Sequence, residues 1–146
     1  MASSRLLVLA VAVVALAVLL GLATSQERPA GGETDAELTA RGVTVYLEQG
    51  CGACHALKAA GTEGSCAPNH DELPALAATR IADAAYAGEA EDAAGYIRES
   101  IVAPAAYMVP DYGFSYHRMP AYDFLSDGDL DALVALLGSA GNGEGE

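Results

Sequence analysis

Two cysteines and a histidine stand together near the middle of the sequence, in the order Cys51-Gly-Ala-Cys54-His55. A thiolate is a strong nucleophile and a soft metal ligand, and a neutral imidazole binds transition metals. Such a group can serve as a dithiol–disulfide couple, as half of a structural zinc site, or as the covalent attachment point of a metal-bearing cofactor. The surrounding sequence distinguishes these three chemistries.

The spacing of the motif favours covalent attachment of a c-type haem. A redox dithiol would lie among alternating strands and helices, and zinc would need two further ligands, for which Cys66 and His70 could be offered. Neither alternative explains a histidine directly after the second thiol. Two thiols three positions apart at the end of a helix reach the two vinyl groups of one porphyrin. We predict one covalent haem c, attached at Cys51 and Cys54, with His55 as an iron ligand.

The elements around the motif are predicted to be helices. Thr34 and Glu37 form a capping box that opens a helix, and Gly50 ends that helix just before the motif. Further helical stretches are predicted at 73–79, 81–86 and 90–102, with loops at 61–72 and 104–124. No strand of note is predicted. The fold class is therefore a small all-α domain.

The last helix has the clearest sequence pattern. Ser126 is a good N-cap, and aspartates in the first turn suit the positive end of the helix dipole. Gly138 and the polar tail end the helix. The predicted buried face consists of Leu130, Leu133, Val134 and Leu137.

The N-terminal segment is apolar and uncharged from Leu6 to Ala23. As a helix it would span about 27 Å, close to the hydrocarbon thickness of a bilayer. We predict a signal-anchor or signal peptide at 1–25, a flexible tether at 26–33, a folded domain at 34–138 and a disordered tail at 139–146. The small residues Ala23-Thr24-Ser25 leave cleavage open. Either way the domain lies outside the cytoplasm: anchored to the outer face of a bacterial cytoplasmic membrane, or secreted to the periplasm after cleavage.

The formal net charge of −13 narrows the choice of partner. An acidic surface repels phosphate backbones, which argues against binding of nucleic acid. A docking partner should be basic or uncharged where it meets this chain.

From Thr34 to Leu137 the chain resembles a class I cytochrome c domain. The resemblance is carried by Gly42 and Tyr46 before the motif, by Tyr96–Ile101, and by the Met119-Pro120 pair before the last helix. The chain is similar to the domains associated with bacterial haem–copper oxidases. The resemblance implies N- and C-terminal helices that cross beside one covalent haem.

The resemblance also implies the second iron ligand, because an electron carrier usually has a filled iron coordination shell. Met119 fits best, since it precedes Pro120 and lies a short loop before the final helix. A thioether ligand favours ferrous iron and raises the potential relative to a second imidazole. The alternatives are Met108, His117 and His70.

Other residues are expected around the haem. Pro68 matches the family position beside the iron-bound histidine, where a carbonyl can accept the Nδ1–H of His55. Tyr96 is expected to shield the haem, and Arg98 is a candidate partner for a propionate, as is Arg118.

Two residues on either side of Pro68 depart from the family pattern. Cys66 replaces a usual small residue, and we expect it to be buried and inert, the alternatives being a bridge to a partner or a second copy and a redox role. His70 stands where an aliphatic side chain is usual, and we expect a solvated loop histidine. If His70 lay near the haem edge, it could make the potential pH-dependent.

Together these features predict a one-electron carrier and not an enzyme, with no small-molecule substrate. The expected donor and acceptor are respiratory: a quinol-oxidising complex and a haem–copper terminal oxidase. One alternative is a haem-bearing subunit of a larger oxidase or dehydrogenase. Another is a peroxidase or gas sensor, which would need an open iron position.

Overall fold

The computed structural model describes residues 32–112 and 118–141. The predicted N-terminal membrane or signal helix, most of the tether and residues 142–146 of the tail lie outside this part of the chain. Within residues 32–112 and 118–141, no helix combines the length and apolarity needed to cross a membrane. The folded unit begins at Glu33.

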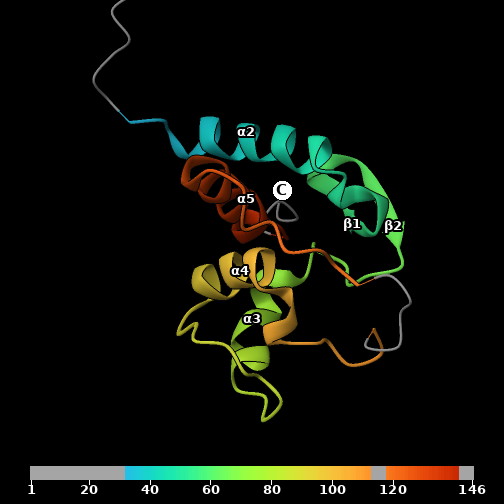
Figure 1. The fold of residues 1–146 in the computed structure, drawn as a ribbon. Helices are drawn as coiled ribbons and strands as arrows, with labels where there is room; N and C mark the ends of the chain where they lie inside the picture. Colours follow the sequence, from blue (N-terminus) through green and yellow to red (C-terminus); the bar gives the residue numbers. More distant parts are fainter. Residues whose placement is uncertain (1–31, 113–117, 142–146) are drawn as a thin grey trace, which may run out of the picture. The chain divides into compact units, whose positions relative to one another are not determined.

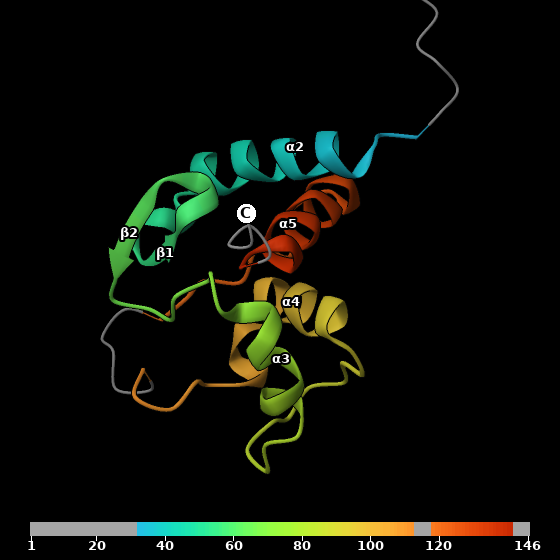
Figure 2. The same ribbon diagram turned by 180° about the vertical axis from the view of Figure 1, so that it is seen from behind.

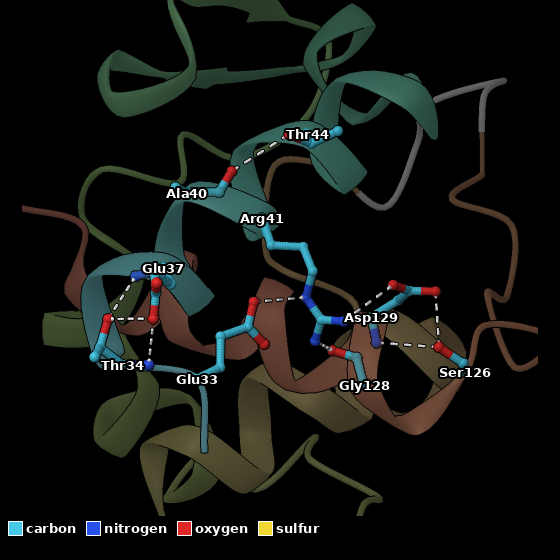
Figure 3. Close-up of polar contacts among 9 residues, drawn as sticks. All are labelled: Glu33, Thr34, Glu37, Ala40, Arg41, Thr44, Ser126, Gly128 and Asp129. Atoms are coloured by element: carbon cyan, nitrogen blue, oxygen red, sulfur yellow. Dashed lines mark hydrogen bonds and ion pairs between the residues drawn. The ribbon is translucent and has the colours of Figure 1, made fainter. Parts of the chain in front are cut away.

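Helix α2, Asp35–Glu48, begins where the capping box predicts. The backbone N–H of Glu37 donates to Thr34 Oγ1 at 3.3 Å, and the N–H of Thr34 donates to the Glu37 carboxylate at 2.9 Å. Figure 3 shows this reciprocal pair. Such a cap is worth about 0.5–2 kcal/mol of stability. The helix ends at Gln49, and Gly50 follows in a left-handed conformation with φ 71°.

Helix α5, Asp127–Ser139, crosses α2 and forms the centre of the core. Figures 1 and 2 show the two helices packed against each other, although they lie at opposite ends of the unit's sequence. A Cβ atom on Gly42 would lie 2.8 Å from Leu136 Cβ and closer still to the carbonyl oxygen of Ala132. The crossing therefore requires glycine at this position. The predicted apolar face is confirmed at Leu130, Leu133 and Leu137, and the fully buried Leu136 extends it; Val134 is half-buried.

Arg41 ties the two helices together at the start of α5. Its guanidinium donates to the carbonyl oxygen of Gly128 and lies 4.0 Å from the Asp129 carboxylate. Glu33 pairs with the same guanidinium at 3.5 Å. Figure 3 shows the Arg41 side chain reaching from α2 toward these groups.

The absence of strands is a wrong prediction. Strand β1, His55–Leu57, pairs antiparallel with β2, Thr62–Ser65, so part of the predicted loop at 61–72 is a strand. Gly61 reverses the chain between them in a left-handed conformation with φ 64°. Strands this short carry no readable alternation of apolar and polar residues, and a short 3-10 turn, Lys58–Ala60, separates them.

Two further helices lie beneath α5 in Figure 1. Helix α3, Leu73–Ile81, is one helix where two stretches were predicted, and residues 83–86 form turns. Helix α4, Ala93–Val102, starts three residues later than predicted, because Asp92 caps it by accepting the N–H of Gly95 at 2.7 Å. A short 3-10 turn, Pro104–Ala106, follows α4. The domain is thus mostly helical, with one small hairpin.

Candidate functional site

The cysteine motif forms a tight turn at the end of α2. Residues Cys51–Ala53 are a single 3-10 turn, and the N–H of Cys54 donates to the carbonyl oxygen of Cys51 at 3.2 Å. In a 3-10 turn, side chains three positions apart lie on the same side. Both thiols line one small cavity, together with Tyr122 from the segment before α5. Burial raises the pKa of the Cys51 thiol.

His55 is buried and its imidazole is held in one tautomer. Its Nδ1 lies 2.7 Å from the carbonyl oxygen of Pro68. A carbonyl only accepts, so Nδ1 carries the proton and Nε2 keeps a free lone pair. Burial lowers the pKa of His55, although the Pro68 carbonyl opposes that shift. The ring is therefore neutral and ready to bind a metal through Nε2, and the contact expected of Pro68 is present.

Two adjoining cavities lie against this motif, with volumes of about 90 and about 380 Å³. The larger is in the range typical of cofactor sites. Both are lined by His55, Met119, Ile101 and Leu137, so they form one continuous site. The larger cavity has apolar walls from three helices and the loop after α4, including Leu73, Ile97 and Val109.

The candidate iron ligands are not all at the same place. Met119 lines both cavities, from the segment that leads into α5. Met108 lines only the larger cavity and its side chain is exposed. His117 lies outside the described residues. The structure therefore brings Met119 and His55 to one site, and the pairing on iron stays a prediction.

Three tyrosines line the larger cavity, and one of them is Tyr96, for which the shielding of a haem stays a prediction. Tyr96 is buried and lines this cavity with Tyr107 and Tyr112. Tyr96 and Tyr107 pack edge to face, with ring centroids 6.4 Å apart. The Tyr107 hydroxyl donates to the Asp83 carboxylate at 2.8 Å, which holds the ring in place.

The arginines divide between the cavity and the surface. Arg98 lines neither cavity: it hydrogen-bonds Asp131 and lies 3.8 Å from Asp127, both on α5. Arg118 lines both cavities, and Arg80 lines the larger one with its guanidinium 6.0 Å from the Tyr96 ring centroid. Arg80 was not predicted to line the site. Its spacing of seven residues from Leu73 and three from Ala77 is the sequence signal that could have placed it on the inner face of α3.

Cys66 is exposed, so the expectation of a buried, inert thiol is wrong. His55 pairs with Ser65 at the end of the hairpin, and Cys54 and Cys66 are the residues just beyond this pair, outside both strands. The Cys66 thiol lies 3.9 Å from the carbonyl oxygen of Cys54. A side-chain hydrogen bond between the Cys54 and Cys66 thiols raises the pKa of the Cys54 thiol. Among the residues that the structure describes, no cluster of three or more His, Cys, Asp or Glu side chains could hold a metal ion, so the zinc alternative gains no support.

His70 is not a solvated loop residue, and that prediction is wrong. Its ring stacks on the ring of His55, with centroids 3.8 Å apart and planes 16° from parallel. Burial, with His55 and Arg80 nearby, lowers the pKa of His70 to about 3. The ring is therefore neutral at neutral pH. It also lines both cavities.

A model of the family described as Cytochrome c matches residues 39–141 of this chain. The matched span contains the cysteine motif and every residue that lines the two cavities. Comparisons with curated proteins and with solved structures returned no match.

Proposed function

We propose that this chain, which belongs to the cytochrome c family and is a haem-based electron carrier, passes single electrons from a quinol-oxidising complex to a haem–copper oxidase. The main support for the proposal is the turn at Cys51–Ala53, which lies beside an apolar cavity. There, two thiols, an imidazole with a free Nε2 and a methionine line one site.

Covalent haem c is the cofactor of this family, and the residues present fit it. Cys51 and Cys54 would hold the porphyrin by thioethers, and His55 would bind the iron through the nitrogen that Pro68 leaves free. When bound, the haem iron supplies the one-electron step. The protein excludes water through the apolar wall and orients the imidazole.

We assign the second iron ligand to Met119. It lines both cavities beside His55, whereas Met108 lines one and is exposed. If Met119 and His55 both bound the iron, its coordination shell would be filled and no open position would remain for a substrate or a gas, which favours electron transfer over catalysis. It would also give a high potential, which suits a donor to a terminal oxidase.

Charge supports the choice of partner. The net charge of −13 would favour a basic docking face on the oxidase, and attraction across such an interface raises the rate of encounter. The apolar segment from Leu6 to Ala23 would confine the domain to the outer face of the membrane, beside both partners. Such confinement raises the effective concentration without a tight interface.

Absorption spectra of the haem-loaded protein test the ligand assignment. The wild type should be low-spin with a weak long-wavelength sulfur–iron band, and Met119→Ala should lose that band. Met108→Ala is the matched control and should keep it. A high-spin wild type that binds carbon monoxide readily would contradict the electron-carrier proposal.

A kinetic experiment tests the partner. The reduced protein is mixed with membranes that hold a haem–copper oxidase, and its oxidation is followed by absorbance. We expect a rate that falls as ionic strength rises, because salt screens the attraction between an acidic carrier and a basic docking face. If a small chemical oxidant oxidises the protein but the oxidase does not, the proposed acceptor is wrong.

Membrane fractionation with mass measurement tests the location. An anchored protein stays with the membranes and keeps residues 1–25. Recovery in the soluble fraction, with a mass that starts near Gln26, would replace the anchored form with a secreted one.

A further inference from the structure

The imidazole of His55 has a second neighbour besides the Pro68 carbonyl. The ring of His70 lies flat against it, 3.8 Å between centroids and 16° from parallel. The bond from Nδ1 to Pro68 acts in the plane of the His55 ring. Hydrogen bonds to carbonyl oxygens tolerate a broad range of angles, so this bond alone resists tilting of the ring weakly. A flat neighbour against the ring face resists the tilt directly.

His70 is itself held in place from two sides. Its backbone N–H donates to the carbonyl oxygen of Ala56 in β1 at 2.9 Å, and its carbonyl oxygen accepts the N–H of Leu73 at 3.1 Å. The backbone that carries the ring is thus fixed between the hairpin and the first residue of α3. The ring therefore cannot leave the stack through movement of the chain alone.

The side chain of His70 is fixed by Tyr46, which is fully buried. The Tyr46 oxygen lies 3.2 Å from His70 Nδ1 and donates to the carbonyl oxygen of His55 at 3.3 Å. A tyrosine hydroxyl has one hydrogen, so donation to that carbonyl leaves its oxygen to accept the Nδ1–H of His70. Burial raises the pKa of Tyr46 to about 12, so the hydroxyl keeps its hydrogen. One tyrosine thus connects the iron ligand's backbone with the ring stacked on its side chain.

We propose that His70 is a positioning residue, anchored by Tyr46, that sets the tilt and rotation of the His55 imidazole at the haem iron. The inference rests on the covalent haem and the histidine ligation of the proposed function, and it does not depend on the partner proteins. Groups around a ligating histidine commonly set its orientation and strengthen its binding. Here a stacked ring would do so alongside the usual carbonyl.

Three variants separate stacking from hydrogen bonding. His70→Phe keeps a flat ring and loses the bond to Tyr46, His70→Leu loses both, and Tyr46→Phe removes only the hydroxyl. Thr79→Ala is the matched control, because Thr79 is exposed on α3 and lines neither cavity. Covalent haem content and a low-spin spectrum are checked first in the wild type. Their absence would contradict the haem site itself and not the role of His70.

The readout is the nuclear magnetic resonance spectrum of the ferric protein, in which the spread of the haem methyl shifts reports the plane of the axial imidazole. We expect His70→Leu to change that spread, His70→Phe to stay near the wild type, and Tyr46→Phe to change it in the same direction by less. Thr79→Ala should leave the spread unchanged. A wild-type spread in both His70→Leu and Tyr46→Phe would overturn the proposal, as would equal changes in His70→Leu and Thr79→Ala.

Discussion

Replacing Gly42 with alanine should destabilise the domain by about 2 kcal/mol. The new Cβ would lie 2.8 Å from Leu136 Cβ and closer to the Ala132 carbonyl oxygen. Carbon atoms pack best at about 3.5–4.0 Å, so α2 and α5 would have to separate by about 1 Å. A backbone carbonyl cannot rotate away, which puts the overpacking cost near the upper end of its usual range of about 1–3 kcal/mol. The better helix propensity of alanine returns about 1 kcal/mol.

Urea unfolding of the haem-loaded protein, followed by circular dichroism, measures this loss. The midpoint should fall while the slope with denaturant stays the same, because the change acts on the folded state. The melting temperature should fall by about 10 °C for a domain of this size.

Gly138→Ala is the matched control for this experiment. Gly138 also lies in α5, but it is exposed, and a Cβ there would meet only Ile97 Cδ1, at 4.0 Å. Without a clash, the propensity gain should dominate, so this variant should be as stable as the wild type or more stable, by up to about 1 kcal/mol. If Gly42→Ala behaves like Gly138→Ala, the close crossing is not what requires glycine.

Three further predictions concern the surroundings of the site. Hydrogen bonds from the Ala85 N–H and the Tyr107 hydroxyl lower the pKa of Asp83. The ionised Asp83 carboxylate therefore contributes to folding stability above its ordinary pKa of 3.8, and this contribution is lost as pH falls through the lowered pKa. The stability gap between the wild type and Asp83→Asn should therefore shrink in acid unfolding, and a gap that stays constant down to about pH 2 would contradict this. Arg98→Ala should cost about 0–1 kcal/mol in urea unfolding, because exposed ion pairs are weak; it should leave the haem reduction potential unchanged, and a shifted potential would place Arg98 near the haem after all. Cys66→Ser should raise the fraction of chains that acquire haem in an oxidising thiol–disulfide buffer, since Cys66 is exposed close to Cys54 and can form a competing disulfide with it; equal fractions by mass spectrometry would count against that competition.

The features that sequence analysis predicted correctly are those set by local chemistry. The capping box at Thr34 and Glu37, the N-cap at Ser126 and the apolar spacing of the last helix depend on residues three or four positions apart. The haem motif is equally local. Gly42 was predicted only in part. The family resemblance placed it where two helices cross, but its close approach to the Ala132 carbonyl oxygen is known only from the folded structure.

The features that sequence analysis missed depend on what lies opposite in space. The hairpin needs Gly61 to turn the chain, and its strands are too short to show a period. His70 reads as a loop residue until the fold brings His55 and Tyr46 to it. Arg98 lies on a helix whose other face meets the cavity, and only the rotation of α4 shows that it faces α5 instead.

The crossing of α2 and α5 has a consequence for the order in which the chain is made, packs its helices and receives its cofactor. Arg41 and its acceptor Gly128 are separated by 87 positions, so α2 cannot pack against α5 until the chain has been made beyond Gly128. Closing so long a loop comes late in folding, because its entropy must be lost before the contact forms. During that interval the turn at Cys51–Ala53 is already synthesised, while α2 and α5 have not yet packed together. The two thiols are thus most accessible before the last helix docks, which is when attachment of a large planar cofactor meets the least obstruction.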